Sequence, residues 1–208
     1  MGALRKHRSM TMAEFLVWED RQDERHEFIH GEIVAMNGGT VAHNQISGNL
    51  YTALRSALRG TPCRVFQENM KIAADDSIVY PDVFVTCARL NDQDRLATEP
   101  TVIVEVLSDS TASRDRLVKN TAYRTLPSLT QYVIVNQRVA AVESVRREGA
   151  NWLHEVVTGE QGVLRIPALG VDVPLSVIYE DTETPFDLEG LDDSPDEGAE
   201  ATEARHTP

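Results

Sequence analysis

The chain has 208 residues, a hydrophobic content of 41% and a formal net charge of -13, which indicate one soluble domain with loose ends. Its longest apolar runs stop far short of the roughly 18 residues that a spanning helix needs, so no membrane segment is expected. The basic residues 5–8 are not followed by the apolar stretch of a secretory signal, and we expect a cytoplasmic protein.

The cysteine content argues against a disulfide framework. Only Cys63 and Cys87 are present, which is also too few for a four-thiolate zinc site. Cys87 ends an apolar run, and free cysteine is among the most buried residue types. We therefore expect Cys87 to be a buried, reduced thiol.

The negative charge is concentrated at the C-terminal end. From Asp181 onward there are ten acids against Arg205 alone, which leaves 23 acids against 19 bases in the rest. This distribution weakens the objection that an acidic chain does not bind nucleic acid, although no basic stripe favours sequence-independent DNA binding. We predict a disordered N-terminus at 1–9, one domain at 10–180 and a disordered acidic tail at 181–208.

The predicted elements begin with a helix, a strand pair and a longer helix. Thr11 and Glu14 have the spacing of a capping box that opens a short helix. Residues 26–36 read as two extended runs bent at Gly31, and a turn follows them at 37–39. Apolar residues at helical spacing then predict an amphipathic helix from Val41 to Leu58.

The rest of the chain is richer in strands. Strands are predicted at 63–72, 78–86, 101–108 and 131–135, with a helix from Ser113 to Leu126 before the last of them. Residues 140–179 alternate and contain several glycines, which is typical of an antiparallel meander. This order indicates an α/β or α+β fold, in which helices flank a mixed central sheet and extra antiparallel strands stand at both ends.

The predicted strand at 101–108 is apolar on both faces, as a central, buried strand is. Glu105 lies between Ile103 and Leu107 on one of these faces, where an unpaired carboxylate costs several kcal/mol. A cation would remove that cost. That cation is either a metal ion or a structural Arg or Lys. A third alternative is that Glu105 lies near the end of the strand and reaches water.

A second carboxylate lies on the preceding strand. Asp82 follows Pro81 inside a hydrophobic run, where both residue types are disfavoured. One interpretation is a Pro-Asp turn between two short strands. The other pairs Asp82 with Glu105 as two hard oxygen ligands, which Mg²⁺ prefers in phosphoryl-transfer sites.

Lys119 supplies a third group. At about 100° per residue, it lies on or beside the core-facing stripe of the helix predicted from Ser113. It is either a lysine that snorkels at the helix border or one whose ammonium stabilises negative charge at a scissile phosphate.

Three groups of residues together carry a resemblance to a known family. They are Tyr80-Pro81-Asp82, the run 100–108 with Glu105, and the spacing Asp115-x-x-x-Lys119-x-x-x-Tyr123. With the segment 26–32, they resemble the Uma-two family of restriction-endonuclease-like proteins, within the PD-(D/E)XK nuclease superfamily, over residues 11–179. The resemblance implies a restriction-endonuclease-like sheet, metal-dependent cleavage of DNA phosphodiester bonds and a homodimer.

The chain departs from the superfamily pattern at one position. Leu107 stands two residues after Glu105, where the superfamily lysine projects on the same face. The resemblance implies that Lys119 takes over this role from the helix.

Two further positions are weaker candidates for the active site. His43 shares the apolar face of its helix and is either a satisfied core histidine or an active-site residue. Glu27 and Glu32 fall on opposite faces of a regular strand, so at most one faces the site, and we favour Glu32.

Three hypotheses about function follow. The first is an endonuclease that uses Mg²⁺ or Mn²⁺, with Asp82 and Glu105 as metal ligands and Lys119 as a catalytic residue. The second is an inactive nuclease fold that binds nucleic acid or protein. The third is a hydrolase that uses Ser108 or Ser110 with His43, which is weaker because no Gly-x-Ser-x-Gly motif occurs.

Overall fold

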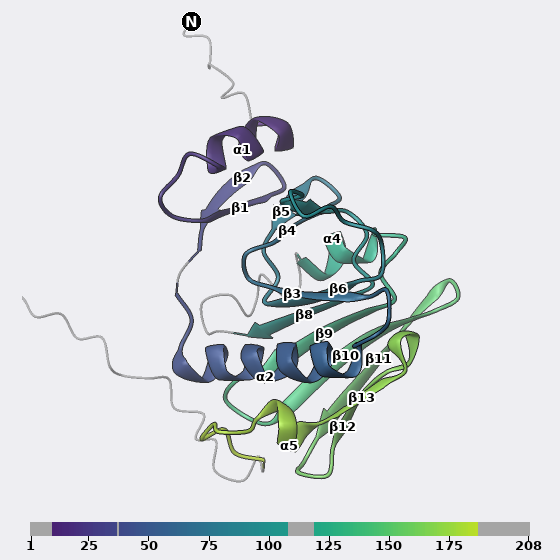
Figure 1. The fold of residues 1–208 in the computed structure, drawn as a ribbon. Coiled ribbons are helices and arrows are strands. Elements are labelled where there is room, and N and C mark those ends of the chain that lie inside the picture. The colour runs from purple at the N-terminus through teal and green to yellow at the C-terminus, as the bar shows by residue number, and fades with distance from the viewer. Residues whose placement is uncertain (1–9, 37, 108–118, 187–208) are drawn as a thin grey trace, which may run out of the picture.

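The computed structural model describes residues 10–36, 38–107 and 119–186 (Figure 1). Two predictions fall outside the described residues. They are the disorder at 1–9 and 187–208, and the start of the helix at Ser113.

A six-stranded sheet lies at the centre of the molecule. In spatial order its strands are β11 (Asn151–Thr158), β10 (Ala141–Glu148), β9 (Gln131–Asn136), β8 (Val102–Leu107), β6 (Val83–Thr86) and β3 (Arg64–Gln67). Strands β8 and β9 pair in parallel, and the other neighbours pair antiparallel. The predicted mixed central sheet is therefore confirmed.

A smaller, five-stranded sheet packs against one face of the central sheet. Its strands, in order, are β2 (Glu32–Ala35), β1 (His26–Ile29), β5 (Ser77–Val79), β4 (Lys71–Ala74) and β7 (Leu96–Ala97). Ile72 and Val79 of this sheet share an apolar core with Phe84 and Ile103 of the central sheet. Helix α1 (Met12–Glu19), which has the predicted capping box, packs Phe15 against the smaller sheet from its other side.

The opposite face of the central sheet is covered by a second apolar core. Helix α2 (Val41–Ala57) lies along it, as Figure 1 shows, and buries Ile46, Leu50 and Leu54 there. The C-terminal part of the chain completes this layer. Its elements are β12 (Val163–Ile166), the 3-10 helix η2 (Pro167–Leu169), β13 (Val171–Pro174) and α5 (Leu175–Ile178).

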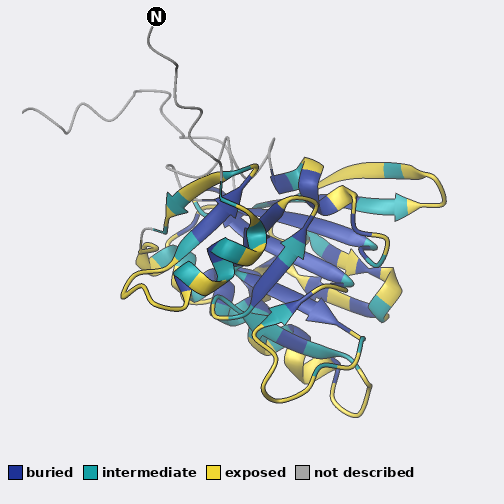
Figure 2. Ribbon diagram, turned by 90° about the horizontal axis from the view of Figure 1, so that it is seen from above, coloured by how far each residue is buried: buried dark blue, intermediate teal, exposed yellow. Residues whose placement is uncertain are grey.

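Strands β8 and β9 are buried on both faces because both of these layers cover them. Figure 2 shows buried strands in the interior and exposed residues mainly on loops and outer segments. In the described part of the chain, no helix has the length and apolar character needed to cross a membrane.

Two long strands predicted from the sequence, at 63–72 and 78–86, are each broken in the structure. The first becomes β3 and β4 and the second becomes β5 and β6, because each run passes from one sheet to the other. The two crossings lie side by side, and the Glu68 amide donates to the carbonyls of Pro81 and Asp82 at 3.2 Å each. Pro81-Asp82 therefore forms a junction between two short strands, and this position of Asp82 is compatible with a role as a ligand.

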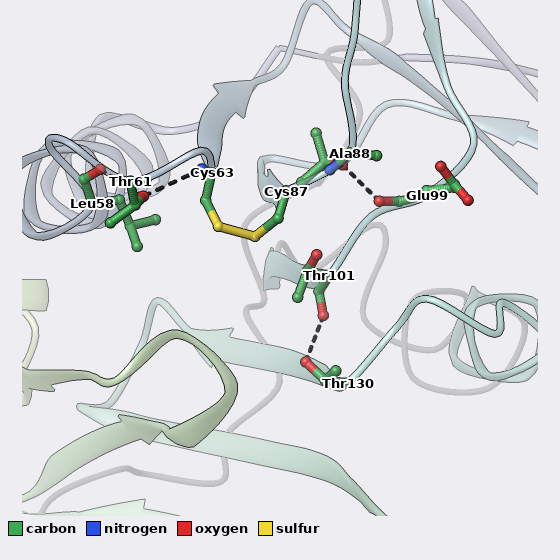
Figure 3. Close-up of a disulfide and its surroundings, with 9 residues drawn as sticks. Leu58, Thr61, Cys63, Cys87, Ala88, Glu99, Thr101 and Thr130 are labelled. Atoms are coloured by element: carbon green, nitrogen blue, oxygen red, sulfur yellow. Dashed lines mark hydrogen bonds between the residues drawn. A yellow bond between two sulfur atoms is a disulfide. The ribbon is translucent and has the colours of Figure 1, made fainter.

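The prediction that Cys87 is a buried, reduced thiol is wrong. Cys87 is exposed and forms a disulfide with Cys63, as Figure 3 shows. The register of β3 and β6 pairs Arg64 with Thr86, so the two cysteines occupy the next pair of facing positions. The disulfide depends on the pairing of two strands, which the apolar run that ends at Cys87 does not indicate.

The folded chain extends beyond residue 180, where the predicted domain ends. Thr184 is 8% exposed, and the Ala140 amide donates to the Pro185 carbonyl at 2.8 Å. Phe186 packs edge-on against Tyr179. The first residues of the predicted acidic tail are therefore part of the packed domain.

Candidate active site

The candidate site lies between the two sheets, on the face of β8 that Glu105 shares with Ile103 and Leu107. Glu105 is 2% exposed. Ile103 and Leu107 belong to the core beneath the smaller sheet, while Val104 and Val106 belong to the core beneath α2. The alternative that Glu105 reaches water at a strand end is therefore excluded, and its charge is balanced inside the protein.

Asp82 lies at the corner where the chain passes from β5 to β6. The antiparallel register pairs Val83 with Val104, and one further position brings Asp82 opposite Glu105. The Val106 amide donates to Asp82 Oδ2 at 2.6 Å, and His43 Nε2 lies 3.3 Å from the same oxygen. Because both contacts use Oδ2, Asp82 Oδ1 remains available as a ligand atom among the described residues.

Lys119 directly precedes α4 (Asn120–Arg124) and is 6% exposed. Its ammonium lies 3.3 Å from Glu105 Oε1 and 3.0 Å from Glu27 Oε1. The alternative of a snorkelling surface lysine is therefore excluded. Leu107 packs in the apolar core. The ammonium that contacts Glu105 comes instead from the segment at α4, as the resemblance to the family implied.

Tyr123 is a further site residue, one helical turn after Lys119. Its hydroxyl donates to Glu105 Oε1 at 2.7 Å. Complete burial, together with the negative charges of Glu105 and Glu27, raises the pKa of Tyr123 well above its usual value. Tyr123 therefore stays protonated and holds Glu105 in one orientation.

The preference for Glu32 over Glu27 is wrong. Glu27 is 6% exposed and binds both Lys119 and the Tyr80 amide, the latter at 3.0 Å, whereas Glu32 is exposed. The assumption of opposite faces also fails, because the turn at His30 and Gly31 pairs Ile29 with Glu32 and so places both glutamates on one face. Glu32 lies beside that turn on the edge strand β2, away from the buried centre of the sheet.

His43 reaches the site from the first turn of α2. Thr40 caps this helix by accepting from the His43 amide at 3.1 Å. A Cβ atom on Gly39 would lie only 2.8 Å from His43 Nδ1, so the glycine allows the chain to pass close to the imidazole. The structure thus brings His43 to Asp82 but does not by itself assign it a catalytic role.

A buried ion-pair network supports the corner before Asp82. The Tyr80 hydroxyl donates to Glu19 at 2.7 Å, and Lys71 Nζ lies 2.5 Å from Glu19 and 2.9 Å from Asp20. Burial lowers the pKa of Lys71, but the two carboxylates outweigh it and the net shift is upward. Lys71 therefore remains charged and ties α1 to β4, the neighbour of the strand β5 that leads into the site.

The site contains several carboxylates. Glu27 and Glu105 both contact the Lys119 ammonium, and Asp82 contacts His43. Carboxylates in a largely buried space are stable only beside cations, and Lys119 supplies one of them.

The donor set suits a hard divalent cation. Carboxylate oxygens are the ligands that Mg²⁺ prefers, and Mg²⁺ is commonly held by one or two protein carboxylates together with water and substrate phosphate. Asp82 and Glu105 fit this requirement. In the described part of the chain, the group of three close ligand side chains is elsewhere, at His30, Asp75 and Asp76, where all three side chains are exposed.

Ser108, Ser110 and Asp115 lie outside the described residues. The hydrolase hypothesis based on the two serines stays a prediction, and the His43 that it invokes contacts Asp82.

Comparison with known proteins agrees with the resemblance stated above. Residues 12–177 match the Uma2 family, described as putative restriction endonuclease. Two proteins of Synechocystis are similar to this chain, and both are named only as uncharacterized. Protein sll1609 is 35% identical to this chain, and the match covers 73% of this chain and 89% of sll1609. Protein slr1290 is 34% identical, and the match covers 82% of this chain and 91% of slr1290.

A solved structure has the same fold. It is the crystal structure of a putative nuclease belonging to DUF820 from Anabaena variabilis. The TM-score is 0.69 at 17% sequence identity, and the match covers 82% of this chain and 97% of the other.

Proposed function

The chain belongs to the Uma2 family, and from that premise we propose that it is a nuclease that hydrolyses DNA phosphodiester bonds with Mg²⁺ or Mn²⁺. The observation that carries the proposal is that the strand register places Asp82 opposite the buried Glu105, whose carboxylate contacts the Lys119 ammonium. Asp82 and Glu105 would hold the ion. We also propose a homodimer and a cytoplasmic location, which follow only from the resemblance and the sequence.

A bound divalent ion would lower the pKa of water and offset the charge that develops on the phosphate. In the hydrolysis, water attacks phosphorus, the bond to the leaving sugar oxygen breaks, and that oxygen takes up a proton. Lys119 stabilises the negative charge of the phosphate, because its ammonium lies beside Glu105. Glu27 and Tyr123 are positioning residues, since Glu27 holds the Lys119 ammonium and Tyr123 holds the Glu105 carboxylate.

His43 is proposed as a positioning residue for Asp82. Together with the Val106 amide it contacts Oδ2, which directs the remaining oxygen of Asp82 toward the cation. A carboxylate fixed by two partners needs less reorganisation when it binds an ion than a mobile carboxylate does.

The proposal is tested by incubating the full chain with plasmid and linear DNA in Mg²⁺, in Mn²⁺ and in a chelator. We expect metal-dependent cleavage, and Asp82→Asn, Glu105→Gln and Lys119→Ala should each reduce the rate by about 100-fold or more. Glu32→Ala is the matched control, because it removes an exposed carboxylate from the same face of the smaller sheet, and it should keep wild-type activity.

The same experiment separates the nuclease from an inactive binding protein. Cleavage that persists in chelator, or in the three site variants, would remove the mechanism. DNA binding without cleavage in either metal would support the binding protein. Thermal unfolding of each variant is needed beside the assay, because Lys119→Ala leaves buried carboxylates unpaired at a cost of about 3–5 kcal/mol.

A further inference from the structure

A pocket of about 320 Å³ lies next to the candidate site on the same side of the central sheet. The strand register relates the two. Glu105 pairs with Ile134 on β9, and Ile134 pairs with Glu143 on β10, so the three residues form one row across the sheet. Ile134 and Glu143 both line the pocket. Since neighbouring strands lie about 4.8 Å apart, the backbone of Glu143 lies roughly 10 Å from that of Glu105.

One wall of the pocket is an aromatic ring held in place by an arginine. Trp152 on β11 lines the pocket, and the Arg147 guanidinium lies 4.4 Å from the centre of its ring. Arg147 also donates to the carbonyls of Leu126 and Leu129, at 2.9 Å each, after the end of α4. Trp152 therefore has a fixed orientation before any ligand binds, which lowers the entropic cost of stacking against it.

The other walls carry hydrogen-bonding groups that are mainly acceptors. Asn120 lines the pocket, and its Oδ1 is buried without a hydrogen-bond partner in the described structure. Glu143 adds a carboxylate that lies 3.3 Å from His154, a further residue of the lining. A buried acceptor without a partner costs free energy, and a ligand that brings an N–H donor removes that cost.

The rim of the pocket carries a cation. Arg124 is exposed on α4, and its guanidinium lies 5.2 Å from the centre of the Trp152 ring. Arginine on an aromatic face contributes to the binding of single-stranded nucleic acid both by stacking and by contact with phosphate. The pocket thus combines a flat apolar surface, acceptors and a cation within reach of the candidate active site.

We propose that this pocket binds one unpaired nucleobase with an exocyclic amine, from a nucleotide that neighbours the scissile phosphate. Trp152 stacks on the base, Asn120 Oδ1 and the Glu143 carboxylate accept from its amine, and Arg124 binds a flanking phosphate. A paired base inside a duplex has its edge occupied and its faces stacked, so it must leave the duplex to enter such a pocket. The inference rests on the proposed nuclease function and adds a preference for single-stranded or bulged substrates, with adenine, cytosine or guanine favoured over thymine.

The test uses the full chain and three fluorescent DNA substrates of one sequence: a single strand, a perfect duplex and a duplex with a one-nucleotide bulge. Binding is measured by anisotropy with Ca²⁺, and cleavage is measured separately with Mn²⁺. We expect the single strand and the bulge to bind at least about tenfold more tightly than the duplex, which corresponds to one stacked base. A thymine bulge should bind more weakly than an adenine or cytosine bulge.

Three substitutions locate the preference in the pocket. Trp152→Leu should reduce the preference for unpaired bases to within about threefold of duplex binding. Asn120→Ala should weaken the discrimination between adenine and thymine, which then depends on Glu143 alone, and it costs no hydrogen bond to Oδ1 in the described structure because that atom has no partner there. Leu153→Ala is the control, because Leu153 neighbours Trp152 on β11 but alternates to the other face and is 42% exposed.

The outcomes distinguish the pocket from the nuclease function. Metal-dependent cleavage with equal binding of all three substrates, or with an unpaired-base preference that Trp152→Leu retains, overturns the pocket and leaves the proposed function standing. If Trp152→Leu loses the unpaired-base preference and Asn120→Ala weakens the base discrimination, without cleavage in Mn²⁺, the pocket is supported and the nuclease is overturned. If no substrate is bound or cleaved, both proposals fail.

Discussion

Three carboxylates and one lysine define the chemistry at the level of single residues, and the neighbours of these groups restrict their orientation. Glu105 accepts from Tyr123, and Asp82 accepts from the Val106 amide. Residues that contact no substrate can therefore alter activity by moving a carboxylate. Two predictions follow at this scale, one for a glycine and one for a tyrosine.

Gly39→Ala is expected to lower nuclease activity by about tenfold or more, because small misplacements of site residues are costly. The added methyl group would lie 2.8 Å from His43 Nδ1, so the imidazole must move relative to Asp82. Steady-state cleavage rates measure the effect. Gly38→Ala is the matched control, since no atom lies within 4 Å of the methyl group there. Equal rates for both variants would show that the position of His43 does not matter.

Tyr123 is expected to make the protein less stable at high pH. Its pKa is raised in the folded state, mainly by burial, so the folded protein keeps a proton that the unfolded chain releases above about pH 10. The stabilisation is complete below that pH and is lost as pH rises, by about 1.4 kcal/mol per unit for each such tyrosine. Urea unfolding at pH 8 and at several values above pH 10 measures it.

Tyr123→Phe should reduce this dependence on pH. The variant has no proton to hold at that position, so its free energy of unfolding should fall less steeply above pH 10 than that of the wild type. It should also be less stable at pH 8, because the hydrogen bond to Glu105 is lost. An unchanged slope would show that Tyr123 does not contribute to the alkaline transition.

At the scale of elements, the crossing of two strand runs between the sheets places Asp82 opposite Glu105. The crossing is tied at its other end by the disulfide between Cys63 and Cys87, which follows the pairing of β3 with β6. The disulfide closes a loop that contains both crossings and the hairpin between them, since the two cysteines are 24 residues apart. It therefore restricts the unfolded chain in the segment that carries Asp82.

Replacing both cysteines by serine is expected to lower the free energy of unfolding by about 3 kcal/mol, the usual effect of closing a loop of this length. Urea unfolding of the wild type with and without a reductant should show the same loss. The double variant should not respond to the reductant. If reduction frees two thiols and leaves the stability of the wild type unchanged, the disulfide does not restrict the unfolded chain in this way.

Features that depend on one element could be predicted from the sequence. The capping box at Thr11, the long amphipathic helix α2 and the buried strand β8 all follow from local patterns, and the structure has them. Glu105 and Lys119 could be identified for the same reason, because each is a charged residue on an apolar face of its own element.

Features that depend on the pairing of separate segments could not be predicted in this way. The disulfide depends on the register of β3 with β6, and the division of the run 78–86 between two sheets depends on the strands with which its halves pair. The error at Glu32 had a signal in the sequence, because a two-residue turn at His30-Gly31 places residues 27 and 32 on one face. Tyr123 also had a signal, since it lies four residues after Lys119 on the same stripe.

At the scale of the whole molecule, the site lies where two sheets and two helices meet. The central sheet supplies Glu105, the smaller sheet supplies Glu27, α2 supplies His43, and Lys119 and Tyr123 come from the segment at α4. The surrounding layers are apolar, which lowers the local dielectric constant and strengthens the electrostatic interactions of the site. The central claim is that Asp82 and Glu105 bind one divalent ion in this space.

The most direct test of that claim is a crystal of the full chain soaked in Mn²⁺, with anomalous scattering recorded at the manganese edge. We predict an anomalous peak within bonding distance of an Asp82 oxygen and a Glu105 oxygen, and no such peak in crystals of Glu105→Gln. Anomalous density found only at the exposed cluster of His30, Asp75 and Asp76, or nowhere on the protein, would contradict the account.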